Sequence, residues 1–322
     1  MDITSMLLHS VKVCCNRFIA QGLVHIVSAT DNVDTLVVSA VNEIHVLRFG
    51  GDSSWTVVHG VASMGEELYV LRSPIYFIDE TLVDVYSKTD FVLLRSLSVP
   101  GLSQHSIQDM TSCATLDCLL IADGEKHCLH KVTRDCRDSP EIWYLSYKPK
   151  GISEGTTCDV CVLVACYGGP LSNTGILLAL NAKGDCARKI ILSQWIESLS
   201  HAVQLSSGEF VIVYRRYWCA RGETIAIVDN TGHVKRSYGD WWIPPSENES
   251  LKQTSSVAVD SDGFVFVTDI GKSRLVLLNP SLKFVRYIAT KIYPERLYLD
   301  RNSRRLFVSH HFPISVISVL QL

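Results

Sequence analysis

The sequence lacks a long apolar run. Stretches such as VCVLVAC are far shorter than the roughly 20 apolar residues that a membrane-spanning helix needs. The start, MDITSMLLHSVKVCCN, has neither the charged beginning nor the sustained apolar core of a secretory signal peptide. A Gly-rich phosphate loop, a GxSxG elbow, an HExxH motif and RING or B-box zinc patterns are also missing. We therefore expect no membrane span, no catalytic residue and no ubiquitin ligase activity.

Charged residues make up only 20% of the chain, whereas hydrophobic residues make up 47%, so the 322 residues can bury a large core. The formal net charge of −3 hides an asymmetry. Residues 1–199 carry 15 basic and 22 acidic residues, and residues 200–322 carry 15 and 11, which gives about −7 and about +4. A partner that is attracted by positive charge is expected on the C-terminal side.

The 11 cysteines are an odd number scattered through strand-like sequence, and Cys14, Cys161 and Cys166 lie inside apolar runs. This favours buried free thiols in a reducing compartment, and we expect a cytoplasmic protein. Metal binding is not expected. Cys158 and Cys161 have zinc-knuckle spacing but no second pair, and the group formed by His127, Cys128, His130 and Cys136 matches no known ligand spacing.

The clearest pattern is the stretch Thr254–Tyr287, TSSVAVDSDGFVFVTDIGKSRLVLLNPSLKFVRY. Short Val-, Leu- and Phe-rich runs are divided by DSDG, IGKS and NPS, which predicts an antiparallel meander of four strands. The runs barely alternate apolar with polar residues, so both faces of the sheet are expected to be covered. One such sheet cannot bury its own faces, and the chain should repeat it.

Weaker copies of this pattern recur along the chain. Their second strands are marked by Val37, Tyr69, Leu119, Val162, Phe210, Phe264 and Leu306, a spacing of roughly 45 residues that is typical of a four-stranded propeller blade. The sequence thus predicts an all-β, closed β-propeller as a single domain over residues 1–322. Seven blades are favoured, with approximate ranges 21–59, 60–100, 105–147, 148–193, 198–238, 252–290 and 293–322.

The segment VAVDSDGFVFVTDIGKSRLVLLN resembles an NHL repeat, in which Asp260, Gly263, Asp269 and Arg274 fall on the family pattern. Lys272 and Ser273 replace the Asn-His pair that names the family. The copies at 113–133 and 200–237 resemble divergent repeats of the C-terminal propeller of tripartite-motif NHL proteins, and the resemblance covers most of residues 105–322. It implies a propeller that binds proteins or single-stranded RNA.

The last copy stops about one strand short, and residues 1–13 hold an unassigned strand, Met6–Val13. We expect these two to pair and to close the ring, which would remove exposed sheet edges. Six blades remain the alternative if residues 1–13 are a linker, because propellers of the NHL family usually have six.

Long loops are expected after the second and fourth strands of each blade, on one face, whereas tight turns such as DSDG and LSSG lie on the other. Loops on a rigid scaffold are where recognition usually occurs. The ligand-face candidates are the aromatic, basic and histidine residues of these loops: Arg216, Tyr217, Trp218, Arg221, Trp241, Trp242, Lys252, Lys272, Arg274, His310, His311 and Phe312.

The function that we expect is a non-catalytic interaction module that binds a protein or peptide through this face. Single-stranded RNA is the alternative ligand, because bases stack on aromatic rings beside basic residues. A metal-dependent propeller lyase or lactonase is a second alternative. Its channel ligands would come from the starts of the inner strands, which read VASM, HAVQ, SSVAV and RLYL, where His201 is the only ligand type. No cofactor is expected.

Overall fold

The computed structural model describes residues 42–48, 56–74, 81–102, 105–136, 138–157, 159–168, 174–196, 198–215, 223–239, 250–290, 293–310 and 316–322. Contacts divide the chain into two compact units, Met1–Val38 and Ser39–Leu322, and all described residues belong to the second. Apart from two short 3-10 turns, Ala114–Leu116 and Ile270–Lys272, the regular structure of the described residues is β-strand. None of their helices is long and apolar enough to cross a bilayer.

The first half of the described chain forms three antiparallel sheets of four strands. Blade 1 is β2 (Thr56–Met64), β3 (Glu67–Pro74), β4 (Leu82–Ser87) and β5 (Leu93–Ser98). Blade 2 is β6 (Ile107–Cys113), β7 (Cys118–Asp123), β8 (Cys128–Thr133) and β9 (Glu141–Tyr144). Blade 3 is β10 (Lys148–Glu154), β11 (Val162–Tyr167), β12 (Gly175–Leu180) and β13 (Cys186–Ile191).

Three further sheets complete the set. Blade 4 is β14 (Ser198–Gln204), β15 (Phe210–Arg215), β16 (Glu223–Val228) and β17 (Val234–Tyr238). Blade 5 is β18 (Val257–Val259), β19 (Val265–Asp269), β20 (Arg274–Leu278) and β21 (Phe284–Ala289). Blade 6 is β22 (Pro294–Asp300), β23 (Arg305–His310), β24 (Val316–Gln321) and, as its fourth strand, β1 (Asn42–Arg48).

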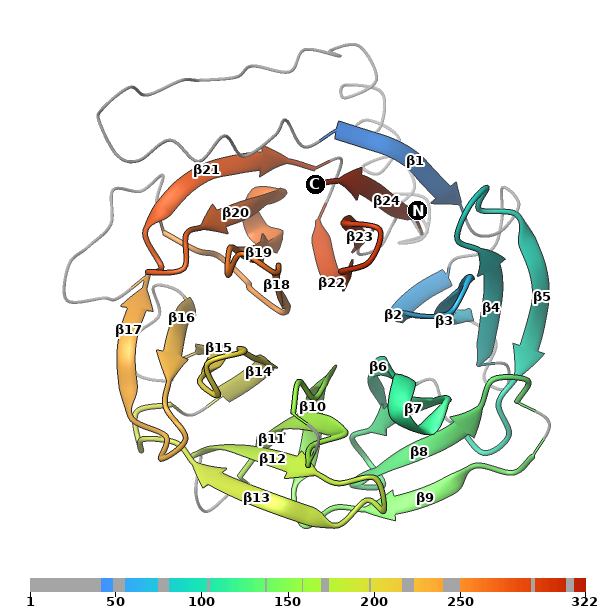
Figure 1. Cartoon of the computed structure of the whole chain (residues 1–322), viewed down its shortest axis with the longest axis horizontal. Helices are drawn as coiled ribbons and strands as arrows, with labels where there is room; N and C mark the ends of the chain where they lie inside the picture. The colour runs from blue at the N-terminus through green and yellow to red at the C-terminus, as the bar shows by residue number, and fades with distance from the viewer. Residues whose placement is uncertain are drawn as a thin grey trace, which may run out of the picture. The chain divides into compact units, whose positions relative to one another are not determined.

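The six sheets are arranged as the blades of a propeller (Figure 1). Their first strands, β2, β6, β10, β14, β18 and β22, contact one another in cyclic order around the centre, and β22 contacts β2 again. Each sheet is open; the ring is made by packing between sheets. The first strand of every blade is therefore the innermost one.

The middle strands of each blade are buried on both faces, as their unbroken apolar sequence predicts. β7, β12 and β16 have no residue that is more than slightly exposed. The buried side chains form clusters between neighbouring sheets, for example Leu120 and Leu129 of blade 2 with Val162 and Val164 of blade 3. Core packing between like sheets thus holds the inner strands around a common centre.

The prediction of seven blades is wrong, because the described chain forms six. The sequence between Val24 and Phe49 supplies only one described strand, β1, and this strand belongs to the last sheet. The expected pairing between an early strand and the last blade does occur, with Asn42 opposite Gln321 and Arg48 opposite Val316. The segment that pairs is β1, while Met6–Val13 lies outside the described residues.

Two of the cysteines that were expected to be free are joined. Cys113, at the end of β6, forms a disulfide with Cys161, just before β11, so the bond ties blade 2 to blade 3. Cys118, Cys128, Cys136 and Cys166 are buried free thiols, and Cys186 is an exposed one. The disulfide removes the main reason for expecting a reducing compartment, and it excludes Cys161 from a zinc knuckle.

Candidate binding site in the central channel

A β-bulge interrupts five of the six inner strands near their first third. The register shifts occur between Val58 and Gly60, Ile107 and Asp109, Pro149 and Gly151, Leu199 and His201, and Pro294 and Arg296. A bulge adds one unpaired residue and turns neighbouring side chains toward a new direction. The residues at and just after the bulges are largely polar: His59, Gln108, Asp109, Lys150, Ser200, His201, Glu295 and Arg296.

A cavity of about 560 Å³ lies among the inner strands. Its lining runs from Asp109, His201 and Arg296 at the level of the bulges to the turns that follow the inner strands, where it includes Glu66 and Asn302. These turns belong to the face on which the sequence predicted the tight turns. The cavity therefore opens on the face opposite to the long loops, and its volume is in the range of sites that bind small groups.

Asp109 and His201 meet inside this cavity although their strands are not neighbours. One carboxylate oxygen of Asp109, Oδ2, accepts a hydrogen bond from the backbone N–H of Ile152 (3.1 Å) and lies 3.6 Å from Nε2 of His201. The other, Oδ1, accepts the N–H of Met110 (2.9 Å). Burial lowers the pKa of His201, more than Asp109 raises it, so the imidazole is neutral at pH 7.

A glycine makes this contact available. A Cβ on Gly151 would lie 2.7 Å from Cδ2 of His201 and 2.5 Å from the carbonyl oxygen of Ser200, far inside normal contact distance. The histidine ring of blade 4 thus passes over the bare backbone of blade 3 to reach blade 2. Nδ1 of His201 is buried and has no hydrogen-bond partner among the residues that the structure describes.

Arg296 reaches the same place from the other side. Its Nη2 donates to the carbonyl oxygen of Gln108 (2.6 Å), so blade 6 contacts blade 2 across blade 1. Its positive charge lowers the pKa of His59 and Lys150, although burial is the larger cause in both, and the pKa of His59 falls to about 4. The positive charge of Arg296 therefore acts on two buried groups at the bulge level of the channel.

The open end of the cavity is more acidic. Glu66 and Asp117 come from the turns of blades 1 and 2, Glu154 is the last residue of β10 in blade 3, and Arg301 comes from blade 6. Some of these charges are engaged: Glu154 accepts the N–H of Ala114 (3.2 Å), and Asp117 lies 3.5 Å from Arg134. Lys88 is paired with Asp300 at 2.7 Å. The mouth of the cavity thus carries more acidic than basic groups, whereas its inner end holds Arg296 together with Asp109.

Most of these channel residues were missed from sequence because the inner strands begin earlier than expected. The predicted starts VASM and RLYL omit His59 and Glu295, whereas RLYL begins at Arg296 and HAVQ begins at His201, both correctly placed on inner strands. The available signal was a polar residue one or two positions before each apolar run. If the bulge is not known, such a polar residue is assigned to the end of the preceding loop and not to the strand.

Three of the predicted ligand-face residues, Lys252, Lys272 and Arg274, do lie together. The backbone N–H of Lys252 donates to Oδ1 of Asp269 (2.8 Å), and Nε of Arg274 donates to its Oδ2 (2.8 Å). Nζ of Lys272 donates to the carbonyl and hydroxyl oxygens of Ser250 (2.7 and 2.9 Å). The side chains of Lys272 and Arg274 thus bind this chain, whereas Lys252 is an exposed residue that takes part through its backbone N–H.

Of the remaining candidates, the structure describes His310 alone. His310 is buried at the end of β23, and its Nε2 hydrogen-bonds with the hydroxyl of Ser318 at 2.9 Å. Arg274 also stacks on the ring of Tyr287, with 3.7 Å between its Cζ and the ring centroid. The other eight predicted residues lie outside the described residues: Arg216, Tyr217, Trp218, Arg221, Trp241, Trp242, His311 and Phe312.

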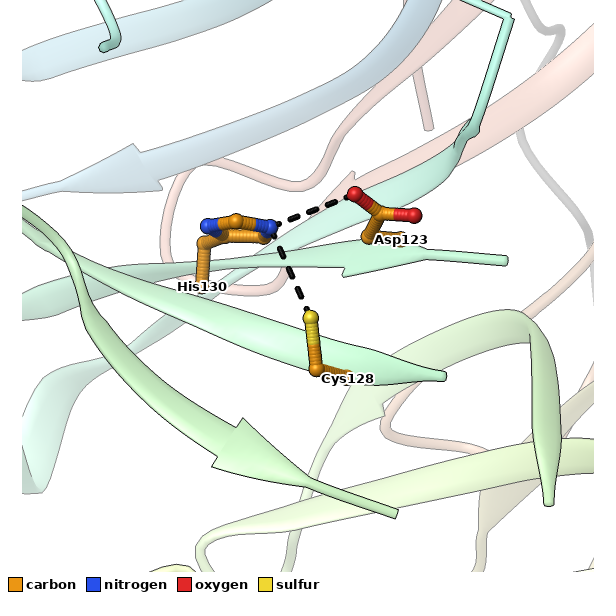
Figure 2. A group of neighbouring side chains, drawn as sticks. All are labelled: Asp123, Cys128 and His130. Carbon is orange, nitrogen blue, oxygen red and sulfur yellow. Dashed lines mark hydrogen bonds and ion pairs between the residues drawn. The ribbon is translucent and has the colours of Figure 1, made fainter. Parts of the chain in front are cut away.

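A second polar cluster lies in blade 2, at the connection between its second and third strands (Figure 2). It consists of Asp123, Cys128 and His130, and the ligand atoms of these three lie within 4.8 Å of one another. Two residues of the histidine–cysteine group noted in the sequence are thus brought together, and His127 and Cys136 are not part of the cluster. Burial and the charge of Asp123 raise the pKa of Cys128 to about 11.

No protein-family profile matches the chain, and no curated protein matches it. Solved structures share its fold. The Cps50 (Swd1) β-propeller domain of Myceliophteria thermophila has a TM-score of 0.56 and 12% identity over 88% of this chain and 100% of that one. A virginiamycin B lyase from Staphylococcus aureus has a TM-score of 0.54 and 9% identity, over 88% of this chain and 89% of that one.

A nidogen/laminin complex also matches, with a TM-score of 0.56 and 11% identity over 73% of this chain and 80% of the matched chain. Identities this low show the fold alone, and the proteins named include an enzyme as well as proteins of other kinds. The comparisons give no support to the NHL-repeat or tripartite-motif resemblance. They support a β-propeller fold, and the sheets of the described chain give it six blades.

Proposed function

We propose that this propeller is a non-catalytic binding module that receives a segment of a protein or peptide partner in the mouth of its central channel. An acidic group of that segment would sit at Arg296. The observation that carries the proposal is the position of this guanidinium at the inner end of a 560 Å³ cavity, where a hydrogen bond to the carbonyl of Gln108 fixes it. A guanidinium has five N–H donors, which leaves donors for a carboxylate.

The proposed binding site lies on the face opposite to the long loops, whereas the sequence predicted the ligand on the long-loop face. On that face, the described basic groups of Arg274 and Lys272 already bind Asp269 and Ser250, which weakens the case for RNA. The channel, in contrast, holds Arg296, whose positive charge adds to burial in lowering the pKa of His59 and Lys150. An acidic group bound at Arg296 would offset this positive charge.

The test uses fluorescein-labelled tetraglutamate, tetraglutamine and tetralysine peptides, with fluorescence anisotropy as the readout. Tetraglutamate should bind best, and Arg296→Met should weaken it roughly tenfold or more, because a charge-assisted hydrogen bond is lost. Arg236→Met is the matched control, since Arg236 is exposed on the outer strand β17. Equal affinities of the two variants, or a preference for tetralysine, would contradict the proposal.

A channel enzyme of the lyase or lactonase type is a second candidate, and the Asp109–His201 pair is the observation that favours it. A neutral imidazole beside a carboxylate can act as a general base. The metal-dependent form has less support, because in the described part of the channel no three His, Cys, Asp or Glu side chains converge. A stoichiometric metal that is lost on His201→Gln, but kept in Cys128→Ser, would support this candidate.

A further inference from the structure

Three other blades show how this fold compensates a buried acid between its second and third strands. Arg72 pairs with Asp84 in blade 1, Arg215 with Glu223 in blade 4, and Arg274 with Asp269 in blade 5. In each pair the acidic side chain is at most 5% exposed. A buried carboxylate needs a cation beside it, and an arginine on the adjacent strand supplies it.

Blade 2 has the acid without the arginine. Asp123 ends the second strand as Asp269 does in blade 5, and its side chain is completely buried. Cys128 is directly opposite Asp123 in the strand register, as Arg274 is opposite Asp269. The nearest lysine, Lys126, is half exposed, lies 3.9 Å from Oδ2 of Asp123, and donates to the carbonyl of Gly101.

Hydrogen bonds alone do not satisfy this cluster. Nε2 of His130 lies 3.3 Å from Oδ2 of Asp123 and 3.6 Å from Sγ of Cys128, as the dashed lines in Figure 2 show. A ring nitrogen carries either a hydrogen or a lone pair. It can therefore donate to the carboxylate or accept from the thiol, and one of the two contacts is always left unsatisfied.

A cation between the three atoms satisfies all of them at once. The carboxylate is already oriented, because its Oδ1 accepts the backbone N–H groups of Glu125 (3.0 Å) and Lys126 (2.8 Å), which leaves Oδ2 facing the histidine. Around a tetrahedral zinc with bonds of about 2.0–2.3 Å, neighbouring ligand atoms lie about 3.3–3.6 Å apart. The two measured separations from Nε2, 3.3 and 3.6 Å, have these values.

We propose that Asp123, Cys128 and His130 bind a structural zinc ion, which takes the place that arginine has in blades 1, 4 and 5. Carboxylate, thiolate and imidazole are zinc ligands, and a thiolate with an imidazole selects against magnesium and calcium. A zinc ion neutralises one carboxylate and one thiolate, so the buried site carries no net charge. Three protein ligands leave one position for water.

The test measures zinc in the purified full-length chain by mass spectrometry of the metal. Wild type should hold about one zinc per chain, and Cys128→Ser and His130→Gln should reduce it at least as much as the roughly 10- to 100-fold losses that follow changes around a zinc site. The matched control is Cys136→Ser, since Cys136 is another buried free thiol just after the same blade's third strand. It should keep the zinc.

A second variant distinguishes the loss of zinc from the loss of the folded structure. Cys128→Arg builds into blade 2 the pair found in blade 5, and it should fold and melt at the same temperature with and without a chelator. Wild type should melt at a lower temperature when EDTA is present. Cobalt bound to the wild type should show a sulfur-to-cobalt absorption band that Cys128→Ser lacks.

The proposal is overturned if the wild type holds no zinc and no cobalt, or if its zinc content is unchanged in both Cys128→Ser and His130→Gln. The proposed channel binding does not depend on this site. Loss of tetraglutamate binding with intact zinc, or the reverse, therefore separates the two proposals.

Discussion

The ring of His201 passes over the inner strand of blade 3 to approach Asp109: Nε2 lies 3.6 Å from Oδ2, although β10 lies between their strands. The crossing depends on Gly151, whose position would bring any Cβ within 2.7 Å of the histidine ring. A small residue in the wall of one blade thus determines which groups of its two neighbours can face each other in the channel.

Replacement of Gly151 by alanine should therefore destabilise the protein. The added methyl would also lie 2.5 Å from the carbonyl oxygen of Ser200, and backbone cannot move away as a side-chain end can. We expect a loss of about 1–3 kcal/mol in the free energy of unfolding, the usual cost of an overpacked site. The measurement is the urea midpoint.

The matched control is Gly208→Ala. Gly208 has a φ of +83° but nothing within 4 Å of its Cβ position, so this change adds backbone strain without a clash. It should cost about 1–2 kcal/mol. His201 should keep its NMR chemical shifts in Gly208→Ala and change them in Gly151→Ala. An unchanged histidine spectrum in Gly151→Ala would mean that the ring does not lie over this glycine.

Stability should fall as the pH drops from 7 to 4. The pKa of His59 is lowered from 6.5 to about 4 in the folded protein, so between these values the unfolded chain binds a proton that the folded one does not. The stabilisation is complete above pH 6.5 and is lost toward pH 4, by about 3 kcal/mol at most. His59→Gln should flatten this part of a plot of urea midpoint against pH, and a plot with the wild-type slope would contradict the assignment.

Reduction should weaken the protein through the bond between Cys113 and Cys161. The two residues are 48 positions apart, and closing a loop of this length restricts the unfolded chain by about 4 kcal/mol. Dithiothreitol should lower the denaturation midpoint of wild type but not of the double variant C113S/C161S. Peptide mapping without reduction identifies the bond, and two alkylated cysteines in that map would refute it.

The pair Arg274–Asp269 should matter more for stability than an exposed pair. Asp269 is fully buried, and Asp269→Asn leaves the guanidinium of Arg274 without its counter-charge, at a cost of about 3–5 kcal/mol. Glu141→Gln removes a pair with Lys131 in which Glu141 is 57% exposed, and it should cost about 0–1 kcal/mol. Equal effects of the two changes in thermal or urea denaturation would refute this ranking.

The propeller was predictable because its middle strands and turns carry strong local signals. Phe264 and Leu119, for example, mark sheets that the structure contains, and turns such as DSDG begin with an Asp whose side chain accepts backbone N–H groups, as Asp260 does from Asp262 and Phe264. The number of blades was not predictable in the same way. β1 looks like part of a blade of its own, and only its pairing with β24 shows that it completes another.

The channel residues were hidden for a different reason. In a strand covered on both faces, apolar residues do not alternate, so sequence gives no register. A one-residue bulge such as that at His59 then produces no recognisable sequence signal. The polar residues that the bulge turns inward are therefore assigned to a loop. The cluster of Asp123, Cys128 and His130 is likewise set by strand register, which places Cys128 opposite Asp123.

The seam of blade 6 has a mechanical consequence. β1 and β24 are antiparallel, with Asn42 beside Gln321, so the chain leaves both strands at the same end of the sheet. A force applied to the chain at Asn42 and Gln321 would break the hydrogen bonds between β1 and β24 one after another. It would not load all of these bonds at once in shear. Tension from tethered neighbours would thus open the ring at this sheet before it disturbed the other five.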